Sequence, residues 1–200
     1  MLRHTGSKDR LSRKFGEILS GMPDFEISKR PYPPGQHGQK RSKSSEYGGL
    51  LHEKQKLRLS YGISEKQFSN YFQKANKVKG PTGEILITLL ETRLDNVVYR
   101  MGFTSTLSAA RQLVSHGHVL VNGKKIDIPS YPVKAGSEIS LREKVAKLDV
   151  VKEALKNNPQ VLDYLKVDKD ACKGKLVAMP NRAQVPVIIN ERLIVEYYSR

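Results

Sequence analysis

The sequence predicts an α+β fold with a helical domain, a smaller domain of helices and a β-hairpin, and a basic N-terminal extension. Three observations support this prediction. Amphipathic segments with helical spacing and cap residues fill residues 46–101. The pair Asn122-Gly123 lies between two short β-rich runs and is the strongest short-range indication of a two-residue hairpin turn. Residues 1–45 are basic, contain irregularly placed glycine and proline, and show little periodicity.

Two capped helices are expected at the start of the helical domain. Ser44 or Ser45 can cap a helix that runs to about Tyr61. Ser64 can cap the next helix, and Gln67 completes a capping box. Aromatic residues of the second helix could stack on a planar ligand, but their helical spacing favours core packing. The side chains expected to face inward are Tyr47, Leu50, Leu51, Leu57 and Tyr61 in the first helix, and Phe68, Tyr71, Phe72, Ala75 and Val78 in the second.

A third helix is expected to follow the break at Gly80-Pro81. It would begin at Thr82 and continue as one long helix until Gly102 ends it. Its buried side is predicted to carry Ile85, Leu86, Leu89, Leu90, Leu94, Val97, Val98 and Met101.

A short helix and the hairpin are predicted to follow closely. Thr104, Ser105 and Thr106 supply an N-cap for a helix through Ser108–Ser115, which Gly117 ends in the left-handed conformation. Strands Val119–Val121 and Lys124–Ile126 then flank the turn. The helix is expected to place Leu107, Ala110 and Val114 toward the core, and Arg111, Gln112 and Ser115 on the opposite, polar side. This polar side and the hairpin tip would form a small, basic concave surface.

The rest of the chain predicts short elements only. A strand is expected at Glu138–Leu141, and an amphipathic helix at Ala146–Lys156. Two further strands are expected at Tyr164–Val167 and Lys175–Met179. Asn190 can cap a last helix.

The distribution of charge indicates a polyanionic partner. The formal net charge is +15 at pH 7, a surplus that repels itself unless a polyanion neutralises it. Residues 1–45 carry 10 basic and 4 acidic side chains, and residues 93–147 carry 9 and 4, so the charge is concentrated in two segments. The single cysteine, Cys172, excludes an internal disulfide framework. No apolar run approaches the roughly 20 residues of a membrane span, so we expect a soluble cytoplasmic protein.

Several motifs resemble one known family. Arg93–Leu141 resembles the S4 RNA-binding domain in its order of helix, helix and hairpin, and in ARQLVSHGHVLVNGKKIDIPSY at Ala110–Tyr131. That domain also occurs in pseudouridine synthases, some tRNA synthetases and heat-shock RNA-binding proteins. Four more motifs resemble the small-subunit ribosomal protein S4 family itself, in its bacterial or organellar type: PPGQHGQKR at Pro33–Arg41, EKQKLRLSYGISEKQF at Glu53–Phe68, LLETRLDNVVYRMGF at Leu89–Phe103 and VEYYSR at Val195–Arg200.

This resemblance implies a domain division and a function. It implies a basic extension over 1–45, a helical domain over 46–90 that the tail 180–200 rejoins, and an S4-type domain over 91–179. The implied function is that of a structural constituent of the small ribosomal subunit. Such a protein is a primary binder of 16S-type ribosomal RNA, nucleates assembly of the subunit body and contributes to translational accuracy. The implied partners are this RNA, the fifth small-subunit protein and mRNA near its path into the subunit.

The residues expected to bind RNA fall into three chemical groups. Arg93, Arg100 and Arg111 suit bidentate contacts with phosphates. Lys40, Arg41, Lys43, Lys124 and Lys125 would act as point charges, whereas Gln112, Ser115, His116, His118 and Asn122 can reach 2′-hydroxyls or base edges. The other residues expected to contact RNA are Arg3, Lys8, Arg10, Arg13, Lys14, Pro34, Gly35, Gln36, His37, Gly38, Lys54, Lys56, Arg58, Asn96, Thr104, Ser105 and Tyr131.

Two rival functions use the same RNA-binding domain. Arg93-Leu94-Asp95 resembles the Arg-Leu-Asp of pseudouridine synthases, in which the aspartate is the nucleophile. No separate catalytic domain follows, and Asp95 is expected to pair with Arg93 or Arg100 instead, so we predict that the protein is not an enzyme. A free-standing RNA chaperone is the second alternative.

No metal or other cofactor is predicted. The S4 family has a zinc-binding form with four cysteines in its N-terminal segment, but Arg3–Arg30 contains none. The nearest candidates, His4, Asp9 and Asp24, lack a thiolate pair, and His116-Gly117-His118 offers only two ligands. Contact with RNA is therefore expected to order the N-terminal segment.

A chelator should leave the folded protein unchanged, because structural zinc needs four closely spaced ligands and the sequence offers no such set. Far-UV circular dichroism before and after treatment with EDTA measures this. Stoichiometric zinc in the purified protein, together with loss of helicity on chelation, would contradict the prediction.

Overall fold

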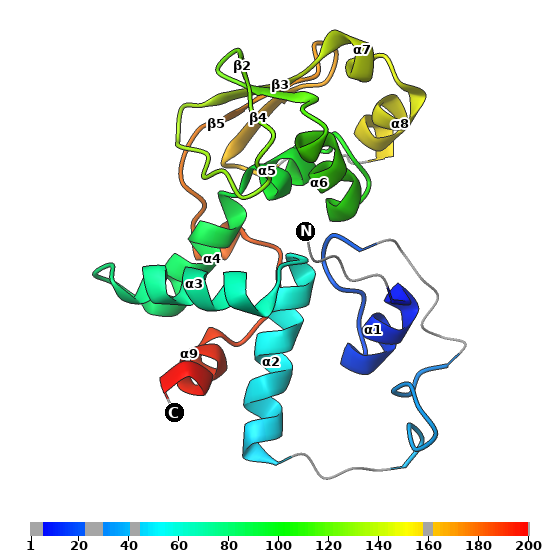
Figure 1. The fold of residues 1–200 in the computed structure, drawn as a ribbon, viewed down its shortest axis with the longest axis vertical. Coiled ribbons are helices and arrows are strands. Elements are labelled where there is room, and N and C mark those ends of the chain that lie inside the picture. The colour runs from blue at the N-terminus through cyan, green and yellow to red at the C-terminus, as the bar shows by residue number, and fades with distance from the viewer. Residues whose placement is uncertain (1–5, 23–29, 41–44, 158–161, 200) are drawn as a thin grey trace. The chain divides into compact units, whose positions relative to one another are not determined.

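The computed structural model describes residues 6–22, 30–40, 45–157 and 162–199, and its helices and small antiparallel sheet confirm the α+β class. Two compact units form the chain: unit 1 is Met1–Gly83 with Val187–Arg200, and unit 2 is Glu84–Pro186. The helices of unit 1 are α1 (Lys8–Phe15), α2 (Glu46–Ser60), α3 (Glu65–Asn76) and α9 (Glu191–Ser199), and α4 (Thr82–Glu91) leads into unit 2 (Figure 1).

Helices α2 and α3 begin at the predicted caps. The Ser45 hydroxyl accepts a hydrogen bond from Gly48 N at 3.1 Å, and the Ser64 hydroxyl accepts one from Gln67 N at 3.4 Å. Two of the predicted inward positions are wrong, because Tyr47 and Val78 are each 54% exposed. Tyr47 lies in the first turn of α2, where its ring contacts only the edge of the core through Tyr197 of α9, with centroids 5.7 Å apart. Val78 lies beyond the end of α3. The buried members of the two predicted stripes are Leu50, Leu57, Tyr61, Phe68, Phe72 and Ala75.

Helix α9 packs on α2 and α3 through aromatic rings. The ring of Tyr198 stacks on Phe72 with centroids 4.4 Å apart, and its hydroxyl donates to Glu65 Oε1 at 3.0 Å. The Lys54 ammonium lies 4.4 Å from the centroid of the Tyr197 ring. The predicted cap is confirmed, because Asn190 Oδ1 accepts a hydrogen bond from Arg192 N at 3.2 Å. The last residues of the chain therefore complete the core of unit 1.

Helix α1 was not predicted, because residues 1–45 were expected to be irregular. Its local signs are present: Ser7 caps it by accepting from Arg10 N at 3.4 Å, and Gly16 ends it in the left-handed conformation. Eight residues form only a little more than two turns, which is too short for a clear helical periodicity in the sequence.

The single long helix expected from Thr82 to Gly102 is wrong. Helix α4 ends at Glu91, and α5 (Leu94–Arg100) begins after an extended residue, Arg93. Nothing in residues 84–101 breaks a helix locally, since they contain neither glycine nor proline. The break comes from tertiary hydrogen bonds: Leu94 N donates to Tyr131 O at 2.9 Å, and Val133 N donates to Thr92 O at 2.8 Å.

Unit 2 is built around an antiparallel sheet with the strand order β2-β1-β3-β5-β4. Helices α5 and α6 lie beside the sheet (Figure 1), and their apolar residues join those of the strands in one core that includes Val97, Val114 and Ile139. The predicted hairpin is confirmed, with φ of 49° at Asn122 and 78° at Gly123, as a type I′ turn requires. The remaining elements of unit 2 are α6 (Leu107–Ser115), β1 (Val119–Val121), β2 (Lys124–Lys125), β3 (Glu138–Leu141), α7 (Glu143–Ala146), α8 (Asp149–Asn157), β4 (Leu165–Asp168), β5 (Lys173–Leu176) and a 3-10 turn at Arg182–Gln184.

Some predicted boundaries in unit 2 differ from the structure. The helix expected at Ala146–Lys156 is confirmed as α8, which begins at Asp149 after a turn at Lys147-Leu148. The short helix α7, which precedes this turn, was not predicted. The last strand begins and ends earlier than expected, since its register is fixed by pairing with β3 and β4 rather than by its own apolar residues. Within the described ranges, no helix has both the length and the apolar character needed to cross a membrane.

Replacing Ser64 with alanine should lower the free energy of unfolding by about 1 kcal/mol, because α3 loses a side-chain N-cap. Urea unfolding followed by circular dichroism measures this change. The matched control is Ser69→Ala within the same helix, which removes a hydroxyl that caps nothing. Equal stability of the two variants would contradict the assigned cap.

Candidate nucleic-acid interface

A buried aspartate at the start of α5 holds two arginines. Asp95 is 0% exposed and accepts hydrogen bonds from Arg93 Nε at 3.0 Å and Arg93 Nη2 at 2.8 Å. Arg111 of α6 approaches the same carboxylate with Nε at 2.8 Å and Nη2 at 2.7 Å. The predicted pairing of Asp95 with Arg93 is thereby confirmed. Because both carboxylate oxygens accept from guanidinium groups, Asp95 is not placed to act as a nucleophile.

A second buried carboxylate lies at the end of α4. Glu91 is 0% exposed, and its oxygens accept from Arg100 Nη2 at 2.8 Å and from the Tyr164 hydroxyl at 3.2 Å. The Asn96 amide also donates to Glu91. Burial and the neighbouring Glu91 charge raise the pKa of Tyr164, so its hydroxyl remains protonated and donates. This contact ties Tyr164, the residue before β4, to the junction between α4 and α5.

The three arginines expected to bind phosphates are therefore largely buried in unit 2. Arg93, Arg100 and Arg111 are exposed by only 3%, 9% and 9%, and Asn96 by 2%. The expectation that Arg111 lies opposite the core side of α6 is wrong, because its guanidinium is needed beside Asp95. The spacing contained this information: Arg111 follows Leu107 by four residues and precedes Val114 by three, so all three share one face.

Three basic residues of α2 are also used inside unit 1. Lys54 is 3% exposed and forms a 2.7 Å ion pair with Glu65. Lys56 pairs with Glu17 at 2.6 Å, and Arg58 donates to Gln55 Oε1 at 2.8 Å. Lys54 is therefore buried, and Lys56 and Arg58 are half-buried, so the expected contacts of these three residues with RNA stay predictions.

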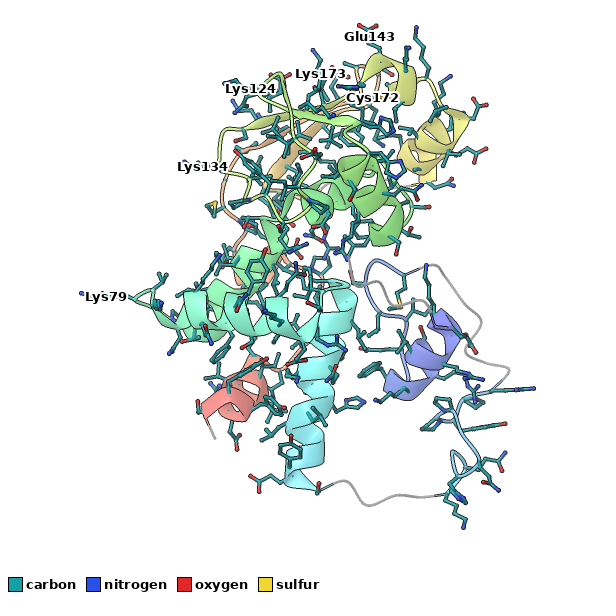
Figure 2. The ribbon with its side chains drawn as sticks, viewed as in Figure 1. Lys79, Lys124, Lys134, Glu143, Cys172 and Lys173 are labelled. Atoms are coloured by element: carbon teal, nitrogen blue, oxygen red, sulfur yellow. The ribbon has the colours of Figure 1, made fainter. Side chains whose placement is uncertain are left out.

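An exposed polar surface remains on α6 and the hairpin. Gln112 and His116 are exposed on α6 and at its end, and Lys124 and Lys125 are exposed on β2. We call these four residues the α6–hairpin surface. It offers two ammonium groups, an imidazole and an amide on rigid elements, which suits phosphates and 2′-hydroxyls. Figure 2 shows Lys124 at the hairpin, away from the core.

Gly117 brings the two parts of this surface together. It ends α6 with φ of 68°, and a Cβ built there would lie 2.1 Å from Lys125 Cε and 2.9 Å from Lys125 Nζ. The Lys125 side chain therefore crosses directly over Gly117, next to the C-terminal end of α6. A glycine is required for both reasons, the left-handed backbone and the close approach.

The other expected residues of unit 2 have mixed positions. Ser115 is half-buried and donates to Arg111 O at 2.8 Å, while Asn122 is exposed and accepts from Glu138 N at 2.9 Å. His118 is half-buried, with its ring 6.0 Å from that of His116. Thr104 is buried, Ser105 is exposed and Tyr131 packs partly against the core.

The N-terminal segment forms a compact turn held by protein contacts. Gly38 N donates to Gly35 O at 3.2 Å, and a Cβ on Gly38 would meet Pro33 O at 1.9 Å. Arg13 Nε donates to Arg30 O and Tyr32 O at 3.2 Å each, and its guanidinium lies over the Tyr32 ring. Arg13, which is expected from the sequence to contact RNA, thus also joins α1 to residues 30–32. The residues of this segment that remain exposed are Arg10, Lys14, Gly35, Gln36, His37 and Lys40, and Lys8 and Pro34 are half-buried.

Some expected residues lie outside the described part of the chain. These are Arg3, Arg41 and Lys43, together with the metal candidates His4 and Asp24. Among the residues that are described, no three His, Cys, Asp or Glu side chains come together in a way that could hold a metal ion.

The fold and this surface define the class of protein, an S4-type RNA-binding protein. Residues 92–139 match the family described as S4 domain, and residues 3–91 match the family described as Ribosomal protein S4/S9 N-terminal domain. The ribosomal family is structural rather than enzymatic, and the chain is not an enzyme.

Curated relatives agree with both matches over the whole chain. The chain is 55% identical over 201 residues to small ribosomal subunit protein uS4 of Lysinibacillus sphaericus (strain C3-41), and 53% identical over 201 residues to that of Geobacillus sp. (strain WCH70). It is 52% identical over 200 residues to that of Phytoplasma australiense, and each match covers 100% of both chains. The chain belongs to the small ribosomal subunit protein uS4 family.

Replacing Arg111 with alanine should lower the free energy of unfolding by roughly 3 kcal/mol, because the buried Asp95 carboxylate loses one of its two guanidinium partners. Urea unfolding of the variant measures the change.

The matched control is Gln112→Ala, the next residue of α6, which is exposed and should change stability by about 0.5 kcal/mol or less. If Arg111→Ala unfolds at the same urea concentration as the unmodified protein, the ion pair with Asp95 does not stabilise the fold.

Proposed function

We propose that the protein is a structural constituent of the small ribosomal subunit and binds the RNA of that subunit directly, in the cytoplasm. The observation that supports this most strongly is full-length identity of 53% and 55% to relatives named small ribosomal subunit protein uS4. The α6–hairpin surface supplies the contacts that such a role requires. The finer role, implied by the family resemblance, is early binding to 16S-type RNA, nucleation of the subunit body and a contribution to translational accuracy.

The α6–hairpin surface is suited to RNA by its chemistry and its rigidity. An RNA duplex hides its base edges in a deep, narrow groove, so proteins recognise it through phosphates, 2′-hydroxyls and shape. Lys124 and Lys125 provide charge for phosphates, and Gln112 and His116 provide hydrogen bonds for hydroxyls. The buried arginines have a different role in this proposal: they fix α5 and α6 so that the surface is preformed.

The compact turn of unit 1 is the second part of the proposed interface. Gln36, His37 and Lys40 are exposed on it, and Arg13 holds its base. The proposed division into domains is the one expected from the sequence, with residues 1–45 as the extension, 46–90 with 180–200 as the helical domain and 91–179 as the S4-type domain. The proposed protein neighbours include the fifth small-subunit protein, and mRNA is proposed to pass nearby.

The affinity for small-subunit ribosomal RNA should fall steeply with salt. The logarithm of the association constant should decrease by about 0.7–0.9 per phosphate contact for each tenfold rise in salt. Filter binding of a full-length RNA transcript between low and moderate salt measures this slope. A flat titration would contradict the proposed function, and release of the protein from intact subunits at high salt would favour a free RNA chaperone instead.

The hairpin lysines should account for part of that slope. The double variant Lys124→Gln, Lys125→Gln should bind more weakly and with a slope smaller by roughly 1.5. The matched control is Lys144→Gln, Lys147→Gln, which removes the same charge from exposed positions in and after α7. Equal slopes for the two double variants would place the phosphate contacts elsewhere.

A further inference from the structure

Helix α3 and the turn after it form a second basic surface outside the α6–hairpin surface. Residues 66–83 contain four lysines and no acidic residue. All four, Lys66, Lys74, Lys77 and Lys79, are exposed. Figure 2 shows Lys79 at the tip of the turn that follows α3, with its side chain pointing away from the ribbon. We call these four residues the α3 lysine surface.

The charges of this surface are not balanced within the described parts of the chain. None of the salt bridges there involves any of the four lysines. The one acidic residue of α3, Glu65, is held by Lys54 at 2.7 Å and by Arg58 at 3.5 Å. Lys74 and Lys77 lie three residues apart on the helix surface, where like charges destabilise each other. A polyanion would remove that repulsion.

The helix dipole explains only part of this arrangement. Lysines near the C-terminal end of a helix are stabilising, which accounts for Lys74 and Lys77 without any ligand. The dipole does not account for Lys66, which lies in the first turn where a positive charge is unfavourable. It also does not account for Lys79, which lies beyond the helix.

The surface is rigid, as an RNA contact of defined geometry requires. Ser64 caps the start of α3, and Lys77 N donates to Lys74 O at 3.3 Å at its end. Behind the lysines, Phe68 and Phe72 are buried and stack on Tyr198. Lys66 and Lys77 are eleven residues apart, which is about 16 Å along a helix. This length spans several phosphates of one RNA strand.

The neighbouring side chains favour RNA over an acidic protein. Asn70 and Gln73 are exposed amides between the lysines, and amides can bond 2′-hydroxyls. Tyr71 is half-buried, and the Lys74 ammonium lies 5.9 Å from the centroid of its ring. Polar groups of this kind around separated ammonium groups fit a sugar–phosphate backbone, whereas a protein partner is usually held by a more apolar centre.

We infer that the α3 lysine surface is a third contact of this protein with the sugar–phosphate backbone of small-subunit ribosomal RNA, separate from the α6–hairpin surface and from the compact turn around Gln36 and His37. This inference rests on the proposed function and names a site that it does not include.

The test compares two variants of the full-length protein that each lose four lysines. The first carries Lys66→Gln, Lys74→Gln, Lys77→Gln and Lys79→Gln. The matched control carries Lys144→Gln, Lys147→Gln, Lys152→Gln and Lys156→Gln. The control lysines are also exposed, but residues 143–157 contain three acidic residues among them. Both variants lose the same net charge, so any difference between them is due to position.

The α3 variant should bind a full-length small-subunit RNA transcript at least about tenfold more weakly at 0.1 M salt, with a salt slope smaller by roughly 2–3. The control should stay within about threefold of the unmodified protein. If the two variants have equal affinities, the inference is wrong. The α3 variant could bind as tightly as the unmodified protein while the double variant Lys124→Gln, Lys125→Gln binds more weakly. In that case this inference is wrong, but the proposed function is still supported. If the unmodified protein does not bind the transcript, the proposed function fails as well.

Chemical acetylation of the unmodified protein gives a result that does not depend on folding of a variant. Bound RNA should protect Lys66, Lys74, Lys77 and Lys79 from acetylation, as read by mass spectrometry, and leave the four control lysines reactive. Equal reactivity of the α3 lysines with and without RNA would overturn the inference. Protection that appears only in assembled subunits, with crosslinks to a protein, would overturn it as well.

Discussion

The Asp95 carboxylate, held between Arg93 and Arg111, is the constraint on which unit 2 depends. Burying charged groups is costly unless each is paired and hydrogen-bonded, so these side chains tolerate only a narrow range of geometry. Asp95 fixes the start of α5 to α6, and Glu91 fixes the end of α4 to Arg100 and Tyr164. The break between α4 and α5 follows from this arrangement, because a continuous helix would not present the backbone of Leu94 to Tyr131.

This constraint also determines which groups are available for RNA. Three arginines that suit phosphates by their chemistry are used inside the domain, where they position α5 and α6. The groups that remain exposed on the α6–hairpin surface are two lysines, an imidazole and an amide. They lie on a helix and a hairpin that are packed against the core. A lysine ammonium is a point charge and cannot bind a phosphate through two parallel hydrogen bonds as an arginine guanidinium does. Selectivity for one RNA site must therefore depend more on the shape and rigidity of the protein surface. Gly117 contributes to that preorganisation, because Lys125 can cross the end of α6 only where no Cβ stands.

Features specified by neighbouring residues could be predicted from the sequence. The caps at Ser45 and Ser64 and the turn at Asn122-Gly123 each depend on a few adjacent side chains, and all three are confirmed. Features set by distant residues could not be predicted: the break after Glu91 depends on the backbone of residues 129–133. The burial of Arg111 lay between these cases. Its spacing from Leu107 places it on the core side, although arginine is rarely buried unless it is paired, and only the fold brings Asp95 beside it.

The net charge therefore predicts a polyanionic partner, but it does not predict which basic residues contact that partner. The surplus of +15 indicates a polyanion, but several of its positive charges are balanced inside the protein, by Asp95, Glu91, Glu65 and Glu17. Whether a basic residue can meet RNA depends on whether a carboxylate of the same domain already holds it. Within the described ranges, neither the four lysines of the α3 lysine surface nor the four of residues 143–157 are held by a salt bridge. The two sets differ because acidic residues lie among the lysines of residues 143–157, whereas residues 66–83 contain none. The location of unbalanced charge, which only the folded structure gives, is thus a better guide to the interface than the composition of any segment.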